Sequence, residues 1–501
     1  MLDPRIPLGP LINKWSACQQ QLKLSSPADR RKFKIVVIGA GLSGAAFSAN
    51  LAGLGYTVKT YCLQDSARRS QAASAKCGII SAQSYSSDVN DGVQEFFGDT
   101  IKAGDYRSRE ANVYRLTEIS ESIIDLCVAQ GVPFERDDHG CLLRQHPVAS
   151  QTNGNLFAGD DTGRHILTGA YSSLMKEVKK GNAELFTRHE MMDLVVKEGV
   201  VKGVVLRDLI SGKIFSQRAD AVILASGGYA NIFYDSTNAG TNNASAVFRS
   251  HKRGAFFAHP CFIQMHPTCV AQYAVGGLWV DYNLMSNIPG LFVIGEANFA
   301  DHGANRLGSN SILQCLADGN FIAPLTVADY LARCTPGDEV IINLPVFKEA
   351  EAHATQNINR LLHINGKRHV DDFHRQLGDL LWEKCGLIRG GEKLREALEI
   401  IPQIREEFWG NVKLAENDNH LNQSLEKAGR LADFMEFAEL IVFDAINRAE
   451  SCGCHVREES QNESQEGLRN DEKYSYVAAW EFNGMGKDPS LHKEPLLYEN
   501  I

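Results

Sequence analysis

Short apolar runs separated by glycine turns dominate the first part of the chain. Residues 34–38 (KIVVI) form an apolar run, followed by the glycine turn GAGLSG and by small residues at helical spacing. Another apolar run, TVKTYCL, follows at residues 57–63. The order of strand, glycine turn, helix and strand predicts the first unit of a parallel α/β sheet.

A different pattern occupies residues 183–228, where short β runs alternate with turns. Turn signals at Glu198-Gly199 and Ser211-Gly212 separate the runs, and the last run, ADAVILASGG, is continuously apolar. We expect a hairpin or meander that returns to a buried strand. A further strand, GLFVIGE, follows the Ile288-Pro289-Gly290 turn.

Helical periodicity is strong in two other regions. Apolar residues recur every three or four positions over residues 112–131, which predicts a helix with one buried face. From about residue 371 the chain carries long amphipathic faces, which predict a separate helical domain. The polar stretch 456–471 predicts an exposed loop.

Composition places the chain among ordinary globular proteins. Its 501 residues are 44% apolar and 22% charged, which fits two or three domains. No apolar run approaches the about eighteen residues of a membrane span, and residues 1–15 lack the features of a signal peptide. We therefore expect a protein that is soluble or attached to a membrane only through partners. The net charge of −10 argues against nucleic acid as a partner.

Twelve cysteines are scattered along the chain without paired spacing. The closest pair, Cys452 and Cys454, is too tight for half of a structural zinc site, and no second pair completes it. We expect reduced thiols and no metal site.

Gly39, Gly41 and Gly44 form a G-x-G-x-x-G between a strand and a helix. The first glycine permits the tight turn, the second lets a pyrophosphate approach the backbone, and the third allows close packing of helix on strand. In this context the motif predicts a dinucleotide site.

Two features favour FAD over NAD. A buried strand ends in the small-residue turn at residues 225–228, and a second strand delivers Glu296 just before a helix that opens near Ser311. An acidic side chain there accepts hydrogen bonds from ribityl or ribose hydroxyls, and the helix N-terminus stabilises negative charge on a reduced flavin. The acid usual at the end of the second strand is replaced by Gln64, a weaker acceptor.

Several long motifs carry a specific resemblance. They include DTIKAGDYRSREANVYRL, QMHPTC, GGLWVDYNL, HGANRLGSNS, NRAESCGCHVREE and EKYSYVAAWEFNGMGKDPSLHKE. Together they cover nearly the whole chain, which resembles the flavoprotein subunits of succinate dehydrogenase and fumarate reductase, in particular the bacterial kind linked to a diheme cytochrome b. The resemblance implies a Rossmann-like α/β domain for FAD, interrupted in the family by a capping domain, and a C-terminal helical domain.

The resemblance also implies function and partners. Such a subunit interconverts succinate and fumarate by hydride transfer between the dicarboxylate and the flavin. It docks on an iron–sulfur subunit and, through it, on a membrane cytochrome b subunit at the cytoplasmic face of the inner membrane.

By the same resemblance, His266 and Arg306 occupy substrate-carboxylate positions. The predicted cofactor-binding residues are Gly39, Ala40, Gly41, Leu42, Gly44, Gln64, Arg69, Ser70, Gln71, Lys76, Gly78, Gly227, Glu296, Ser311 and Ile312.

The sequence departs from the family at the flavin. The family attaches FAD covalently to a histidine, and the matching position holds Gln71, which predicts non-covalent FAD. Lys76 stands where the family has a glutamine along the flavin. It either favours an anionic reduced flavin or points to solvent.

A larger departure follows Thr268. Only seven residues separate it from Gly276, where the family inserts a capping domain on the order of a hundred residues. The arginine that shuttles the proton belongs to that domain, and a second substrate histidine is replaced by Gln272. Because a positioned acid or base contributes about 10²–10⁴ in rate, we expect weak or absent turnover by the chain alone.

The expected organisation is an FAD-binding domain in two parts, 1–268 and 276–345, around a remnant at 269–275, followed by a helical domain at 355–455 and a segment at 456–501. Three interpretations remain open. The chain is a catalytic flavoprotein subunit, a non-catalytic FAD-binding scaffold or one that receives its cap from another polypeptide, or a soluble flavin enzyme resembling an aspartate oxidase.

Overall fold

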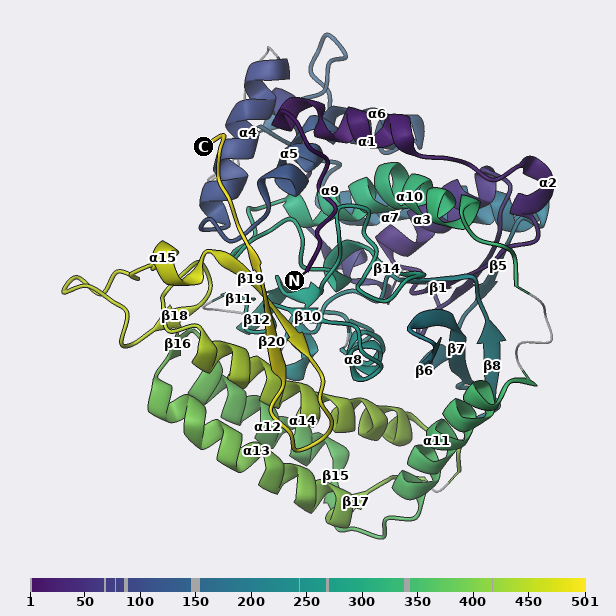
Figure 1. Cartoon of the computed structure of the whole chain (residues 1–501), viewed down its shortest axis with the longest axis vertical. Helices are drawn as coiled ribbons and strands as arrows, with labels where there is room; N and C mark the ends of the chain where they lie inside the picture. The colour runs from purple at the N-terminus through teal and green to yellow at the C-terminus, as the bar shows by residue number, and fades with distance from the viewer. Residues whose placement is uncertain are drawn as a thin grey trace.

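A five-stranded parallel sheet forms the centre of the first half of the chain (Figure 1). The computed structural model describes residues 2–501 except 67–68, 77, 85–88, 146–153, 243, 267–269, 338–342 and 417. The strand order is β14 (Leu291–Val293), β9 (Ala221–Leu224), β1 (Lys34–Ile38), β2 (Thr57–Tyr61) and β5 (Ala183–Phe186), and all neighbours pair in parallel. The prediction of a Rossmann-like sheet is confirmed.

Helix α3 (Leu42–Gly53) follows β1 directly and packs against α7 (Thr162–Lys180). Ten of its twelve residues are buried, which explains why the sequence supplies small side chains here. Helix α9 (Asn310–Leu316), a π-helical turn over Ala317–Ile322 and α10 (Ala323–Ala332) continue the same layer. Two short helices, α5 (Glu110–Glu118) and α6 (Ser120–Ala129), replace the single one predicted over 112–131.

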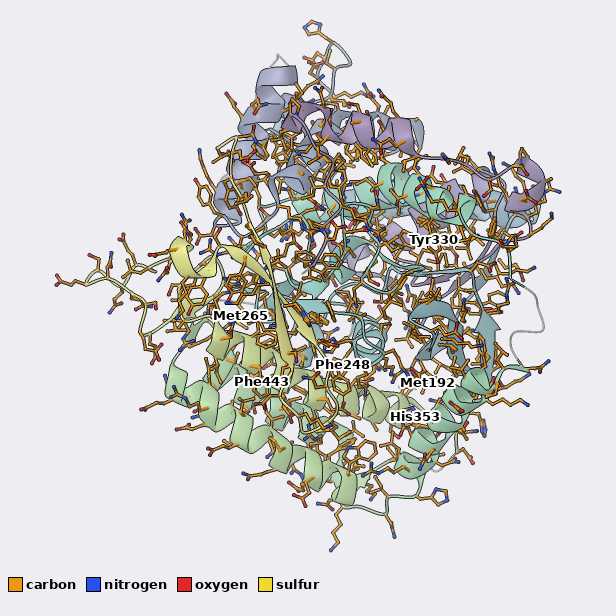
Figure 2. All side chains as sticks on the ribbon, in the orientation of Figure 1. Met192, Phe248, Met265, Tyr330, His353 and Phe443 are labelled. Atoms are coloured by element: carbon orange, nitrogen blue, oxygen red, sulfur yellow. The ribbon has the colours of Figure 1, made fainter. Side chains whose placement is uncertain are left out.

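A separate three-stranded meander, β6 (His189–Lys197), β7 (Val200–Asp208) and β8 (Ile214–Arg218), confirms the second pattern. Its turns contain Gly199 and Gly212 at φ +74° and +73°, a conformation that glycine adopts readily. Helix α11 (Pro345–Leu362) covers the meander, and Figure 2 shows Met192 of β6 and His353 of α11 close together there.

Three long helices lie below the sheet in Figure 1: α12 (Val370–Cys385), α13 (Gly391–Asn411) and α14 (Gln423–Asn447). The predicted helical region is therefore present. Its buried faces belong to the same continuous apolar cluster as the FAD-type sheet, so the helices share a core with the first half of the chain.

The C-terminal strands β19 (Tyr476–Glu481) and β20 (Ser490–Pro495) return to the first half of the chain. They form an antiparallel sheet with β10 (Phe257–Ala258) and β13 (Gly277–Leu278). Arg109 clamps this sheet through a bidentate ion pair with Glu494, with N···O distances of 2.6 and 2.7 Å and side-chain exposures of 2% and 4%. This pair fixes the end of the chain to the centre of the molecule.

Strands β11 (Ile263–His266) and β12 (Val270–Ala274) form an antiparallel hairpin whose connection spans only 267–269. The remaining elements are mostly short, except α4. They are η1 (Leu11–Asn13), α1 (Lys14–Gln21), α2 (Pro27–Arg30), η3 (Gln71–Ser74), η4 (Ala82–Ser84), α4 (Val89–Ala103), β3 (Arg144–Gln145), β4 (Asn155–Leu156), η5 (Ala230–Ile232), α8 (Ser245–Lys252), η6 (Gly295–Ala297), β15 (Arg368–His369), β16 (Ile388–Arg389), β17 (Val412–Lys413), β18 (Val456–Arg457) and α15 (Asp471–Tyr474).

Candidate functional site

The glycine motif forms the turn between β1 and α3. Gly39 has φ +113°, and a Cβ added there would overlap the carbonyl oxygen of Ala225 just past β9. A Cβ on Gly44 would overlap the carbonyl oxygen of Gly39, so helix and turn touch through backbone alone. Gly41 has only the Cβ of Ser70 nearby, at 3.6 Å, and therefore leaves the start of α3 open.

The N-terminus of α3 carries no side-chain cap. Its first amide groups therefore point, uncapped by any side chain, at the space in front of the turn. A helix N-terminus with exposed amides and positive dipole potential is a site for a phosphate group.

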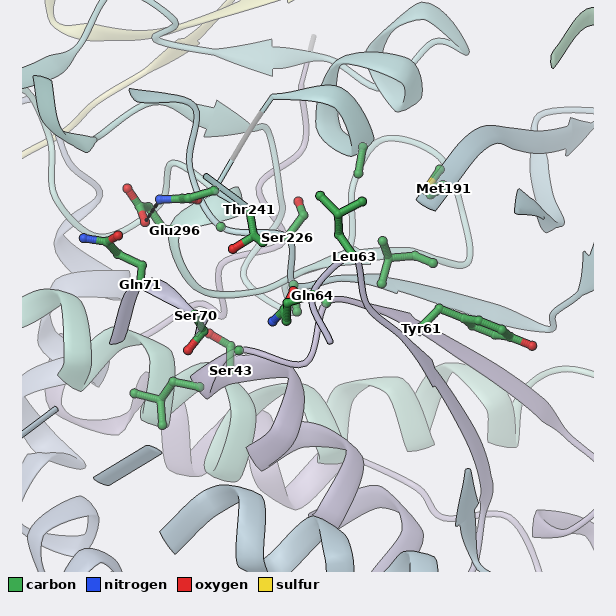
Figure 3. Close-up of a pocket in the computed structure, with 18 of the residues that line it drawn as sticks. Ser43, Tyr61, Leu63, Gln64, Ser70, Gln71, Met191, Ser226, Thr241 and Glu296 are labelled. Carbon is green, nitrogen blue, oxygen red and sulfur yellow. Dashed lines mark hydrogen bonds between the residues drawn. The ribbon is translucent and has the colours of Figure 1, made fainter. Parts of the chain in front are cut away.

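A cavity with about 910 Å³ of empty space opens in front of this turn. The carboxyl ends of β1, β2, β9 and β14 line it, as do the start of β6 and parts of segments 70–72 and 241–246. Figure 3 shows Gln71 and Glu296 at one end of the cavity and Tyr61 and Met191 at the other. An elongated cavity at the carboxyl edge of a parallel sheet is where dinucleotides bind.

Two buried acids line this cavity, Glu190, which pairs with Arg249, and Glu296. The Oε1 of Glu296 accepts a hydrogen bond from the Ala274 amide at 3.1 Å, and its Oε2 accepts one from Nδ2 of Asn242 at 3.2 Å. Burial raises the pKa of Glu296, although the charge of Arg306 and these hydrogen bonds oppose the rise. The Gly228 amide donates a further hydrogen bond to this carboxylate, whose two oxygens together still have room to accept one from a hydroxyl of a ligand.

Several buried polar atoms around the cavity have no hydrogen-bond partner among the residues that the structure describes. They are the hydroxyls of Ser70 and Ser226 and the Oδ1 of Asn242. Buried polar groups are normally hydrogen-bonded, so these atoms fit a polar ligand such as the ribityl chain and phosphates of FAD. Gln71 is held differently, because its Oε1 accepts a hydrogen bond of 2.6 Å from the Ala239 amide.

Eight of the predicted cofactor residues line the cavity: Gly39, Gly41, Leu42, Gln64, Ser70, Gln71, Gly227 and Glu296. The others lie outside its lining. Arg69 is exposed and pairs with Asp65 at 3.0 Å, and Lys76 is exposed, which favours its solvent-facing interpretation. Ala40, Gly44 and Gly78 support the backbone, and Ser311 and Ile312 lie in the first turn of α9.

The sequence did not single out Met191, Thr241 or Asn242, which also line the cavity, and it named Ser226 only as part of the turn at 225–228. Ser226 follows a predicted strand, a signal that could have found it. Thr241 and Asn242 come from an irregular segment without periodicity, and only the fold brings them to the site.

Arg306 lies at the edge of the site, where its charge acts on Glu296. Its guanidinium stacks on Tyr273, with 4.5 Å from Cζ to the ring centroid, and Nη1 donates to the Leu307 carbonyl at 3.3 Å. Nε is buried without a partner. Among the residues that the structure describes, no carboxylate forms an ion pair with this half-buried arginine, so its charge is available to an anionic ligand.

The second predicted carboxylate residue, His266, ends β11, and its side chain lies outside the described part of the structure, as does that of Gln272. Within the described residues, no cluster of three or more His, Cys, Asp or Glu side chains is arranged to hold a metal ion. Cys452 is buried, and the Cys454 thiol donates to the Ala304 carbonyl at 2.8 Å.

Comparison with known proteins agrees with this geometry. Residues 34–274 and 263–312 match the family model described as FAD binding domain, and residues 374–501 match the one described as fumarate reductase flavoprotein C-term. The fold and cavity thus define an FAD-binding flavoprotein.

The relatives are more specific. The chain is 25% identical to the succinate dehydrogenase flavoprotein subunit of Bacillus subtilis over 537 positions, covering 84% of this chain and 90% of the relative. It is 21% identical to the fumarate reductase flavoprotein subunit of Escherichia coli, covering 84% and 88%. The FrdA chain of a quinol fumarate reductase variant of Escherichia coli has the same fold, with a TM-score of 0.83, 19% identity and coverage of 94% and 97%. The chain belongs to the family of flavoprotein subunits of succinate dehydrogenase and fumarate reductase.

Proposed function

We propose that this chain holds FAD in the cavity of Figure 3 and binds a dicarboxylate at Arg306, so that succinate and fumarate are interconverted beside the flavin. The observation that carries the proposal is the half-buried Arg306 guanidinium next to a cavity suited to FAD; its Nε is buried without a partner, and it forms no ion pair among the described residues. A fixed guanidinium fork matches the two oxygens of a carboxylate.

We assign the FAD contacts by position in the cavity. Gly39 and Gly41 leave the amides at the start of α3 to the pyrophosphate, while Glu296 accepts hydrogen bonds from ribityl hydroxyls. Ser70 and Ser226 supply further hydroxyl groups. When bound, FAD supplies a centre that accepts or gives a hydride, and the protein binds and orients it.

Gln71 lies in the cavity at the position that holds the attaching histidine in the family. Its amide nitrogen is not nucleophilic, and its oxygen is occupied by the Ala239 amide. We therefore propose that FAD is held by non-covalent contacts alone.

The partners follow from the family. We propose that the chain docks on an iron–sulfur subunit and, through it, on a membrane cytochrome b subunit at the cytoplasmic face of the inner membrane. In the described part of the chain, no helix combines the length and the apolar character needed to cross a lipid bilayer, so attachment would require such partners.

A missing capping domain is the main departure from the relatives. Strands β11 and β12 pair antiparallel with only three residues between them in the sequence, and the match to the FAD-binding family divides at this hairpin. The alignment with the Bacillus subtilis relative has 537 positions but spans only 84% of the 501 residues, so on the order of a hundred positions of the relative have no counterpart in this chain. We place the two parts of the FAD domain at 1–268 and 276–345 on this basis.

The short hairpin also favours a second candidate, a non-catalytic FAD-binding subunit or one completed by a cap from another chain. The two candidates differ in turnover. The purified holoprotein is assayed with succinate and an artificial electron acceptor, alone and with the co-purifying partners. Robust turnover by the chain alone would eliminate the second candidate.

Substrate binding is tested separately by titrating the holoprotein with fumarate or malonate and following the flavin absorption band. Arg306→Gln should raise the Kd at least about 30-fold, because the partner of a desolvated carboxylate is removed. Arg375 is a matched control, since its guanidinium also stacks on a tyrosine, Tyr234, at 4.9 Å but is exposed on α12. An Arg306→Gln protein that binds as tightly as the Arg375→Gln protein would contradict the proposed site.

A further inference from the structure

Behind Arg306 lies a buried polar cluster that joins three distant parts of the chain. Tyr273 comes from β12, His302 from the segment before α9, and Gln314 from α9 itself. The Tyr273 hydroxyl lies 3.2 Å from both Nε2 of His302 and Oε1 of Gln314, and Nε2 of His302 lies 2.8 Å from Oε1 of Gln314. All three side chains are at most 6% exposed.

The orientation of Gln314 is fixed from the other side. Its Nε2 donates to Oδ1 of Asn298 at 3.2 Å and to the Gly295 carbonyl at 3.5 Å. Oδ1 of Asn298 also accepts from the Ala300 amide at 3.0 Å, which fixes the Asn298 amide as well. Oε1 of Gln314 must therefore point toward Tyr273 and accept its hydroxyl proton.

His302 adds no charge to this cluster. Burial and then the charge of Arg306 lower the pKa of His302 to about 3, so the imidazole is neutral at physiological pH. Its Nε2–H donates to Gln314, and its Nδ1 has no partner. Two neutral side chains, His302 and Gln314, thus hold the hydroxyl of Tyr273 in place.

The orientation of the Arg306 guanidinium depends on the Tyr273 ring, which His302 and Gln314 hold in place. The hydrogen bonds of the guanidinium within the described residues are limited to the weak Nη1 contact with the Leu307 carbonyl, and its Nε has no partner. A long arginine side chain samples many rotamers unless something fixes it. The face of Tyr273, 4.5 Å from Cζ, is the one extended surface against the guanidinium that the structure records.

We propose that Tyr273 is a positioning residue that holds the Arg306 guanidinium plane in place for a substrate carboxylate, with its own ring fixed by Gln314 and His302. The proposal rests on the proposed function, because it assumes that Arg306 binds a carboxylate. It deepens that function by naming the residue that preorganises the anion site.

The test compares two substitutions in the FAD-loaded protein. Tyr273→Leu removes the aromatic face and should weaken fumarate or malonate binding about tenfold. Tyr273→Phe keeps the face, so its Kd should stay within about threefold of the wild type, given the small net contribution of one neutral hydrogen bond. The Kd for FAD, measured by flavin fluorescence, should be the same in both variants.

Tyr330→Leu is the matched control. Tyr330 is also a packed tyrosine, with its ring centroid 5.7 Å from that of Phe292, and Figure 2 shows it on α10, well apart from Met265 of the β11–β12 hairpin. It should leave the dicarboxylate Kd unchanged. Equal binding by Tyr273→Leu and wild type would overturn the proposal, as would equal losses in the Leu and Phe variants.

A double-mutant cycle shows whether Tyr273 acts through Arg306. In an Arg306→Gln background, Tyr273→Leu should have no further effect on the Kd, and additive losses would overturn the proposal. If the wild-type holoprotein binds no dicarboxylate, the proposed function fails. Crystal structures then decide the positioning role, since Arg306 should stay stacked in Tyr273→Phe and leave its place in Tyr273→Leu; an unmoved Arg306 in the Leu variant would overturn it.

Discussion

Replacing Glu296 by glutamine should make the apoprotein more stable and the FAD complex weaker. The side chains have the same shape, and the two hydrogen bonds can be kept. The new carbonyl oxygen accepts from the Ala274 amide, and the new amide nitrogen donates to Asn242, whose Oδ1 has no partner and turns to accept it. The substitution therefore removes a charge without leaving a buried group unpaired.

The expected stability change follows from the raised pKa of Glu296. Its ordinary pKa is 4.5, and burial raises the pKa in the folded state. Below about pH 4.5 the carboxyl is protonated in both states and no difference arises. As the pH rises, the unfolded state releases its proton first, so folding is penalised in the wild type. Glutamine does not ionise, so the Glu296→Gln apoprotein should be more stable than the wild type above this pH.

The expected loss of FAD affinity follows from the charge of the acceptor. A hydrogen bond to a charged group contributes about 1.5–3 kcal/mol, whereas a neutral amide contributes less, so the Kd for FAD should rise roughly 10- to 100-fold. The two effects have opposite signs, which distinguishes this residue from one that merely supports the fold.

The assay measures the melting temperature of the apoprotein between about pH 5 and pH 8 and the Kd for FAD by fluorescence quenching. The advantage of Glu296→Gln should grow with pH. Glu198→Gln is the control, because Glu198 is 84% exposed in the β6–β7 turn and should change neither quantity. A variant that melts lower at pH 8 than the wild type, or that binds FAD equally well, would refute the reasoning.

Three further outcomes are expected. FAD should be released into the supernatant on acid precipitation, because Gln71 offers no covalent link; flavin that stays with the denatured protein would contradict this. Gly39→Ala should lower the flavin content, and it should lower the stability by at least about 1–3 kcal/mol, because it combines a positive φ with a backbone overlap. Gly53→Ala, at the end of helix α3, is the control: its Cβ meets no atom within 4 Å, so it should be harmless. Glu494→Gln should lower the free energy of unfolding, measured by urea titration, by about 3–5 kcal/mol because its arginine partner is left buried and charged. Lys427→Gln, which breaks an ion pair that is about half exposed, should lower it by less than about 1 kcal/mol. Equal losses in the two variants would contradict this prediction.

Local sequence rules predicted the part of the site that depends on backbone. The turn at Gly39, Gly41 and Gly44 is determined by steric contacts between neighbouring segments, and such contacts require glycine at fixed spacing. The parallel sheet and the meander follow from apolar runs and turn residues for the same reason.

Contacts between distant segments were not predictable. Asn242 reaches Glu296 from an irregular segment, and Tyr273, His302 and Gln314 meet only because β12 and α9 pack together. No periodic pattern in the sequence predicts such contacts between distant segments. An amphipathic face shows that a helix packs but not against which core it packs, and the apolar faces of α12, α13 and α14 belong to the same cluster as the sheet.

The two halves of the site differ in what they need from the rest of the protein. The FAD half is built from strand ends and helix α3, which are buried in the continuous core and do not depend on any inserted domain. The substrate half consists of the proposed anion-binding residue Arg306, whose guanidinium stacks on the ring of Tyr273. Binding of a carboxylate requires only the arginine, whereas turnover also requires a proton donor and the exclusion of water. Cofactor binding, ligand binding and catalysis are therefore separable in this chain, and a partner that supplies cover and a proton donor would act on the last of the three alone.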